Sequence, residues 1–154
     1  MGTSSYLIAV GSNAPGARRI VAALGALAGA GETISAIHTT RPVGPGGRAY
    51  ANAAMRIESD LMPPALLAWL KAIEREHGRR PGRRWGPRPL DLDIIGWSGG
   101  VWRSRTLTIP HPAFRTRHFV LAPLIEIAPD WRDPVTGLTV RQLRARLDRR
   151  RPAP

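Results

Sequence analysis

Apolar and acidic residues alternate over residues 90–94, and this stretch constrains the fold more than any other. The even positions are apolar, and the odd positions between them are Asp91 and Asp93. Because successive side chains of a β-strand point to opposite faces, this spacing predicts a strand with one apolar face and one acidic face. The two aspartates would project from the same face, roughly 6.6 Å apart along the strand.

Two neighbouring carboxylates of this kind suggest a site for a metal and a phosphate. Their mutual repulsion is costly unless a cation or polar groups surround them. Mg²⁺ typically binds one or two carboxylates together with substrate phosphates. Guanidinium groups suited to a polyanionic ligand lie just upstream, at Arg79, Arg80, Arg83, Arg84 and Arg88. The alternative is an exposed cluster of ion pairs, which contributes little to stability.

The length and composition predict one globular domain over residues 1–154. The chain has 154 residues, of which 43% are hydrophobic and 22% charged. The absence of cysteine excludes disulfides and thiol chemistry and is compatible with a reducing cytoplasm. No apolar run approaches the ~20 residues of a membrane span, and the first residues lack a signal-peptide core. We therefore expect a soluble, cytoplasmic protein with no membrane partner.

A net charge of +12 indicates an anionic ligand without identifying it. Lys71 is the only lysine, so arginine carries the excess. Nucleic acid, anionic membrane and nucleotide would all be attracted. The arginines near the C-terminus fit the solvated face of a helix, and a nucleic-acid patch is the alternative interpretation there.

The hydrophobic pattern predicts the order βαββαβ, the ferredoxin-like arrangement of the α+β class. Its elements are a strand over 6–10, a helix that includes Val21 and Leu24, and strands over 33–40 and 50–58. A helix then starts near Pro63, and the acidic strand comes last. Both helices would cover one face of an antiparallel sheet, leaving the other face open. Tyr50, Asn52, Asp91 and Asp93 would share that open face. A short strand over 107–109, a helix over 119–127 and a last helix over 138–147 would be C-terminal additions.

Several motifs then match a known family in order along the chain. The central one is Arg84-Trp85-Gly86-Pro87-Arg88, followed by Asp91-Leu92-Asp93. Supporting matches are Gly11-Ser12-Asn13, Tyr50-Ala51-Asn52, Ile109-Pro110-His111 and Arg117-His118-Phe119. With these motifs the chain resembles the 6-hydroxymethyl-7,8-dihydropterin pyrophosphokinases of folate biosynthesis.

The resemblance implies transfer of a pyrophosphoryl group from ATP to the pterin hydroxymethyl group, with release of AMP. Asp91 and Asp93 would hold two Mg²⁺ ions, and Arg79 and Arg88 would be catalytic. The positions matching the family's ATP site are Glu74, Arg84, Trp85, Ile94, Thr108, His111 and Arg117. Those matching its pterin site are Thr40, Pro42, Val43, Tyr50, Asn52, Trp85 and Phe119.

Some of these residues have simpler interpretations. His111 could be only a hydrogen-bonded turn residue, Phe119 only core, and Tyr50 only a shield for the sheet. Glu74 is interpreted mainly as a helix residue that tethers arginines. At the level of the whole chain, an RNA-binding module is the rival interpretation, because RNA-recognition domains share the ferredoxin-like order and a basic charge. A different nucleotide-using transferase is the nearest enzymatic alternative. We expect a monomer that binds ATP and the pterin and no nucleic acid.

Overall fold

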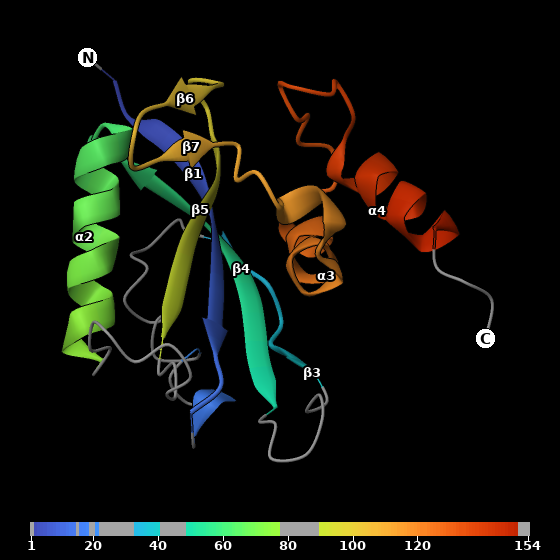
Figure 1. Cartoon of the computed structure of the whole chain (residues 1–154), viewed down its shortest axis with the longest axis horizontal. Helices are drawn as coiled ribbons and strands as arrows, with labels where there is room; N and C mark the ends of the chain where they lie inside the picture. Colours follow the sequence, from blue (N-terminus) through green and yellow to red (C-terminus); the bar gives the residue numbers. More distant parts are fainter. Residues whose placement is uncertain are drawn as a thin grey trace.

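An antiparallel five-stranded sheet organises the chain (Figure 1). The structure, a computed structural model, describes residues 2–14, 16–18, 21, 33–40, 49–77 and 90–150. The strands are β1 (Ser4–Ser12), β2 (Thr33–Ile34), β3 (His38–Thr40), β4 (Tyr50–Ser59) and β5 (Asp91–Trp97). Their order is β2-β4-β1-β5, with β3 also pairing with β4. The chain is therefore an α+β protein in which the acidic strand β5 pairs with β1.

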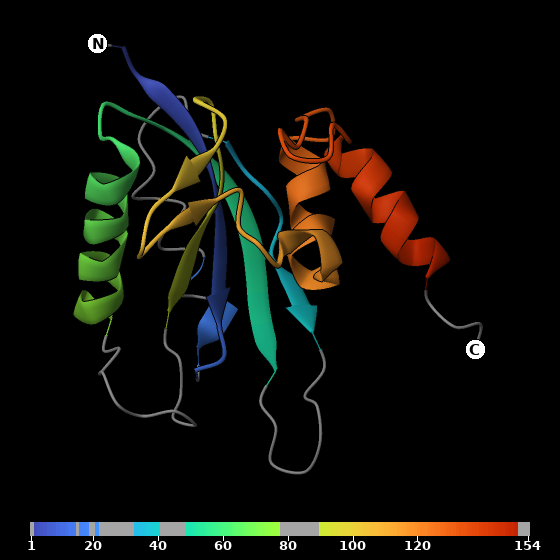
Figure 2. The same cartoon turned by 45° about the horizontal axis from the view of Figure 1, so that its top comes forward.

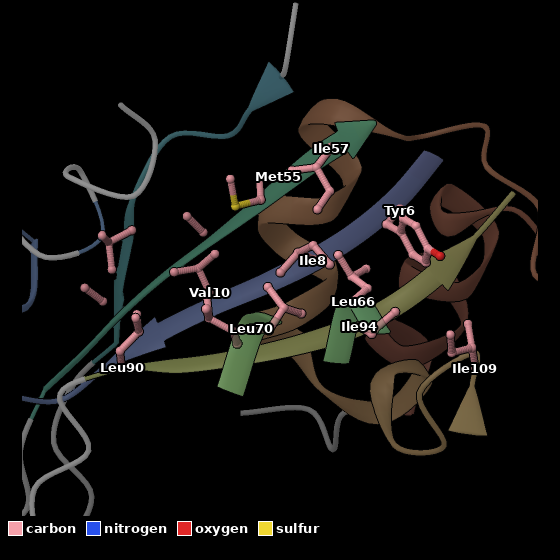
Figure 3. Close-up of a cluster of buried hydrophobic side chains, with 14 residues drawn as sticks. Tyr6, Ile8, Val10, Met55, Ile57, Leu66, Leu70, Leu90, Ile94 and Ile109 are labelled. Atoms are coloured by element: carbon pink, nitrogen blue, oxygen red, sulfur yellow. The ribbon is translucent and has the colours of Figure 1, made fainter. Parts of the chain in front are cut away.

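One face of the sheet packs against α2 (Pro63–Glu76). Tyr6, Ile8 and Val10 of β1 alternate toward this face and are almost fully buried. Leu66 and Leu70 of α2 join them, together with Ile94 of β5 (Figure 3). Leu92 of β5 belongs to the same cluster. The predicted apolar side of the acidic strand is thereby confirmed as core.

The other face is covered as well, which corrects the expectation of an open face with helices on one side only. The short helix η1 (Phe114–Thr116), α3 (His118–Ile127) and α4 (Val140–Arg149) form a second core with Leu7 and Ala54 of the sheet. Figures 1 and 2 show α2 and the α3–α4 pair on opposite sides of the sheet. The physical reason lies in β1, where Tyr6, Leu7 and Ile8 are all buried. A strand with consecutive buried residues needs cover on both faces.

A small hairpin beside β5 forms the start of the C-terminal part. It pairs β6 (Trp102–Arg103) with β7 (Thr108–Ile109). The rings of Trp97 and Trp102 meet edge to face, with centroids 6.0 Å apart. The predicted strand over 107–109 corresponds to β7, whereas its partner β6 was not predicted.

Other elements differ in detail from the sequence prediction. The strand expected over 33–40 is divided into β2 and β3 at Ser35, whose backbone N–H donates to Ala54 O and whose Oγ accepts from Ala54 N. Most of the first predicted helix and the loops over 41–48 and 79–88 lie outside the described residues. In the described part of the chain, no helix has the length and apolar character needed to cross a membrane.

Candidate active site

A row of paired residues crosses the sheet at the polar end of its α3-side face. Gly11 of β1 pairs with Asp91 of β5 on one side and with Asn52 of β4 on the other, and Asn52 pairs with His38 of β3. Adjacent strands lie about 4.8 Å apart, so Asp91 and Asn52 are separated by roughly 10 Å of sheet. Asp93 lies on the same face, opposite Ala9. The predicted sharing of one face by these side chains is confirmed.

Asn52 presents a buried polar group with an unmet hydrogen-bonding requirement. The residue is 6% exposed, and within the described part of the chain its Nδ2 has no hydrogen-bond partner. A buried unsatisfied donor costs about 1–3 kcal/mol. The amide oxygen lies close beside Gly11, within 3.2 Å of the position that a Cβ would take there. An N–H group in this setting is suited to a ligand that offers an acceptor.

The neighbouring residues Thr40 and Tyr50 pair across β3 and β4. The Tyr50 hydroxyl accepts a hydrogen bond from Asn13 Nδ2 at 3.2 Å, and its side chain lies at the surface. The sheet therefore brings three of the predicted pterin residues, Thr40, Tyr50 and Asn52, onto adjacent strands.

The two carboxylates differ in environment. Asp93 is exposed and Asp91 half-buried. The backbone N–H of Leu92, between them, donates to Oε1 of Glu74 at 2.9 Å, and Glu74 is only 2% exposed. Glu74 thus joins α2 to the strand that carries the aspartates, while its Oε2 lies 3.8 Å from Lys71 Nζ.

The two aspartates supply only part of the ligands that a metal ion needs. Among the residues that the structure describes, no group of three or more His, Cys, Asp or Glu side chains is arranged to hold a metal ion. A pair of carboxylates alone fits Mg²⁺, which takes its remaining ligands from water and substrate phosphates. The pair does not fit a closed structural metal site, which needs four protein ligands.

A cavity of about 350 Å³ lies at the outer edge of β5. This volume is within the range of small-molecule sites, about 300–1,000 Å³. Four predicted site residues line it: Asp93, Ile94, Thr108 and His111. Its other lining residues were not predicted from the sequence: Leu67, Lys71, Leu92, Arg105, Thr106, Leu107 and Pro112. The four-residue spacing of Leu67 and Lys71 on α2 was a usable signal, because such residues share a helix face.

His111 is held in one orientation. Its Nδ1 accepts a hydrogen bond from Ala113 N at 3.1 Å, and its backbone N–H donates to Ile95 O at 3.1 Å. Burial lowers the pKa of His111, an effect that Asp93 opposes and Arg117 reinforces. A neutral imidazole whose Nδ1 accepts must carry its proton on Nε2. His111 therefore offers an Nε2–H donor at neutral pH.

Arg117 and Phe119 lie at the start of α3. The Arg117 guanidinium carbon is 5.7 Å from the centroid of the Phe119 ring, and in the described residues Arg117 forms no ion pair. Phe119 is 45% exposed, so its interpretation as a core residue is wrong. A cation and an exposed aromatic ring are thus both available to a ligand. The remaining predicted residues lie outside the described residues: Pro42, Val43, Arg79, Arg84, Trp85 and Arg88.

A family model described as 7,8-dihydro-6-hydroxymethylpterin-pyrophosphokinase (HPPK) matches residues 7–129. The chain belongs to this family. The match runs from β1 through α3 and leaves α4 outside it.

Individual relatives agree with the HPPK assignment, and each is named 2-amino-4-hydroxy-6-hydroxymethyldihydropteridine pyrophosphokinase. The chain is 44% identical to the Synechocystis protein over 117 residues, 76% of this chain and 60% of the relative. It is 44% identical to the Haemophilus influenzae protein over 99 residues, 64% of this chain and 62% of the relative. It is 39% identical to the Pseudomonas aeruginosa protein over 133 residues, 82% of each. The chain thus spans about three fifths of the length of the first two relatives.

Proposed function

We propose that this protein transfers a pyrophosphoryl group from ATP to the hydroxymethyl group of 6-hydroxymethyl-7,8-dihydropterin. The observation that carries the proposal is the cavity beside β5, with Asp93 and His111 on its wall, in a chain of the HPPK family. The cavity lining combines apolar side chains suited to a base with polar groups suited to phosphates.

In the proposed nucleotide site, Ile94 and Thr108 contact the base and ribose side of the cavity. His111 donates its Nε2–H to a phosphate oxygen, and Arg117 supplies a positive charge that no described carboxylate neutralises. Glu74, Arg84 and Trp85 complete the predicted nucleotide set.

Asp91 and Asp93 are proposed to hold two Mg²⁺ ions. Bound magnesium would supply charge neutralisation to the triphosphate of ATP. The chain's own contribution is to keep both carboxylates on one face of β5, and the hydrogen bond from Leu92 N to Glu74 supports that strand from α2.

For the pterin, Asn52 is the proposed recognition residue, because its unpaired Nδ2–H can donate to an acceptor on the ring edge. Phe119 and Trp85 are the proposed stacking partners. Thr40, Pro42, Val43 and Tyr50 complete the predicted pocket.

In the proposed reaction, the pterin hydroxyl oxygen attacks the β-phosphorus of ATP. The bond from that phosphorus to the oxygen bridging it to the α-phosphorus breaks, AMP leaves with the electron pair, and the hydroxyl proton is released to solvent. Arg79 and Arg88 are proposed to offset the charge that develops on the departing oxygen. Comparable arginines in other phosphoryl-transfer enzymes contribute about 10³–10⁵ in rate.

We further infer a ferredoxin-like βαββαβ core and a monomer in the cytoplasm that binds neither nucleic acid nor membrane. The antiparallel order β2-β4-β1-β5 supports the topology. The exposed carboxylate of Asp93 on the sheet argues against an RNA-binding face, because it would repel phosphates.

The decisive test is to incubate the protein with ATP, Mg²⁺ and the reduced hydroxymethylpterin and to identify the nucleotide product. AMP together with the pterin diphosphate is expected. ADP would indicate transfer of a single phosphoryl group, and the absence of any product that depends on the pterin would refute the proposal.

A further inference from the structure

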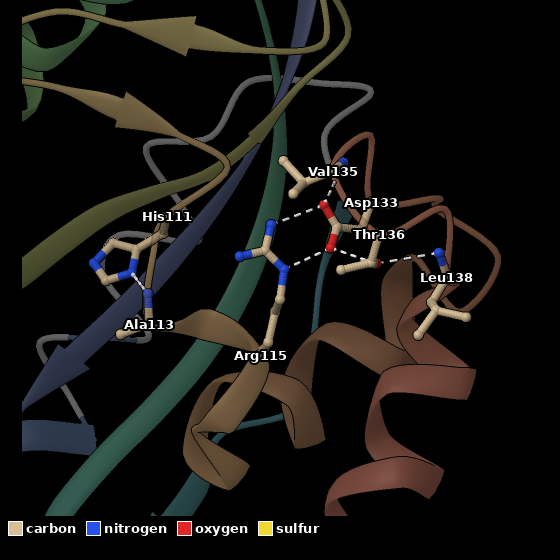
Figure 4. A network of polar contacts seen from close by, with 7 residues as sticks. All are labelled: His111, Ala113, Arg115, Asp133, Val135, Thr136 and Leu138. Atoms are coloured by element: carbon tan, nitrogen blue, oxygen red, sulfur yellow. Dashed lines mark hydrogen bonds and ion pairs between the residues drawn. The ribbon is translucent and has the colours of Figure 1, made fainter.

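A buried ion pair joins the site to the C-terminal part of the chain. Asp133 is fully buried, and its carboxylate accepts two hydrogen bonds from Arg115, from Nε at 2.6 Å and from Nη2 at 2.9 Å (Figure 4). Val135 N and Thr136 Oγ1 also donate to it, at 3.0 and 2.7 Å. The carboxylate therefore accepts hydrogen bonds from four donor atoms. Its bidentate contact with Arg115 fixes the orientation of the guanidinium plane.

Arg115 lies within the turn that carries two proposed phosphate contacts. This turn, residues 111–117, begins at His111 and ends at Arg117. Its backbone is closed by Phe114 N donating to His111 O and by Arg117 N donating to Phe114 O, both at 3.3 Å. Thr116 N also donates to Ala113 O at 3.3 Å, and side-chain contacts on both sides of the turn add to these backbone hydrogen bonds.

The anchors of the 111–117 turn come from two different parts of the chain. On the sheet side, His111 N donates to Ile95 O. On the C-terminal side, the buried ring of Phe114 meets Trp131 edge to face with centroids 6.1 Å apart, and Arg115 pairs with Asp133. Trp131 and Asp133 lie beyond residues 7–129, the part that matches the HPPK family. The C-terminal anchor is thus a feature of this chain outside the family match.

The two arginines of the turn have different roles. Arg115 is bound to a buried carboxylate, so its charge is neutralised inside the protein. Arg117 forms no ion pair among the described residues and is half-buried. A charge already matched by a carboxylate cannot serve an anionic ligand, whereas that of Arg117 can. Arg115, paired with Asp133, therefore serves the shape of the turn, and Arg117 serves ligand binding.

We propose that Asp133 is a positioning residue for the nucleotide: through Arg115 it fixes the 111–117 turn, and with it His111, which lines the cavity, and Arg117 at the other end of the turn. The proposal rests on the proposed function, because it assumes that the cavity beside β5 binds MgATP. Buried ion pairs are often no more stabilising than apolar residues of similar volume. A role in positioning the turn therefore explains this ion pair better than a gain in stability does.

The test compares MgATP binding by the wild-type protein and by the double variant Arg115→Met, Asp133→Leu. Replacing both partners removes the bidentate ion pair without leaving a buried charge unpaired. Calorimetry should show a weakening of MgATP affinity of about tenfold or more, because small displacements of binding groups have large effects. In turnover assays the KM for ATP should rise while the KM for the pterin changes less than about twofold, a split that a general loss of stability would not produce.

Two further variants keep the result interpretable. Arg115→Lys retains the charge without the bidentate geometry, so it should fold and show an intermediate loss of MgATP affinity. If the double variant does not fold, Arg115→Lys tests the positioning role in its place. Arg141→Met, which breaks the exposed pair with Asp130 on the same C-terminal segment, should bind like the wild type. Unchanged MgATP affinity in folded position-115 variants would overturn the positioning role alone. A wild-type protein that binds no MgATP would instead remove the proposed function and this inference with it.

Discussion

Asp91 and Asn52 lie on either side of Gly11, which pairs with both in the sheet. One of these residues belongs to the proposed metal site and the other to the proposed pterin site. The glycine between them has no side chain, and the amide oxygen of Asn52 lies close beside it. The sheet thus holds the two halves of the site at a separation of roughly 10 Å, set by strand spacing.

We predict that Gly11→Val weakens pterin binding without lowering stability much. A Cβ at this position would lie 3.2 Å from Asn52 Oδ1, so the side chain would push the amide or fill the space beside it. Valine is favourable in a strand, which limits the cost to folding. Calorimetry with the pterin in the presence of a non-hydrolysable ATP analogue should show at least about a tenfold loss, equal to about 1.4 kcal/mol. Gly2→Ala is the control, since nothing lies within 4 Å of a Cβ there.

A second prediction separates stability from function at Asn52. Because its buried Nδ2 has no partner in the described residues, Asn52→Leu should leave the free energy of unfolding unchanged or raise it by about 1–3 kcal/mol. Pterin affinity should fall in the same variant. Chemical denaturation and calorimetry measure the two quantities. A variant that is destabilised yet binds the pterin normally would show that the amide serves the fold and not the ligand.

The third prediction concerns the carboxylate pair. Asp93→Asn should leave the fold intact, because the side chain is exposed, and should lower turnover by at least about 10² through loss of magnesium binding. Binding of Mn²⁺, followed by electron paramagnetic resonance in the presence of ATP, gives a readout independent of turnover. Asp130→Asn removes a carboxylate that is 83% exposed and should change neither quantity. Normal Mn²⁺ binding and turnover in Asp93→Asn would contradict the metal assignment.

The fourth prediction is a pH dependence of stability that arises from Asp133. Desolvation by burial raises the pKa of Asp133, but hydrogen bonds from Arg115, Thr136 and Val135 outweigh it and hold the pKa below its ordinary value. A carboxyl whose pKa is lower in the folded than in the unfolded protein stabilises the fold above its unfolded-state pKa, about 3.9. That contribution is lost as the pH falls through the folded-state pKa.

Urea unfolding of the wild type and of Asp133→Asn from pH 7 to pH 3 checks this. The difference in unfolding free energy should be constant, at about 3–5 kcal/mol, near neutral pH and should shrink below about pH 4. A difference in unfolding free energy that grows toward low pH would contradict a lowered pKa for Asp133.

Local patterns predicted the parts of the fold in which one periodicity dominates. The alternation around Asp91 located a strand and both of its faces, and the spacing of Leu66 and Leu70 located α2. The covered second face was missed even though Tyr6, Leu7 and Ile8 are consecutive and apolar. A short apolar run does not state which distant segment will cover it.

The contacts that hold the 111–117 turn to the C-terminal segment could not be predicted from the sequence either. The importance of His111 and Arg117 was inferred from the family resemblance, but nothing in the spacing of Arg115 and Asp133 indicates that they pair. They are separated by 18 positions, and the loop that brings them together is held by its own hydrogen bonds, from Asp133 N to Leu138 O and from Gly137 N to Asp133 O.

The sequence by itself determined which residues share a strand face and which family the motifs resemble, because both depend on neighbours along the chain. Only the tertiary structure decided that Gly11 separates Asp91 from Asn52, that a cavity forms against β5, and that Asp133 reaches the 111–117 turn. Those relationships depend on strand register and on packing between distant segments, where the free energy comes from burial and not from local backbone preference.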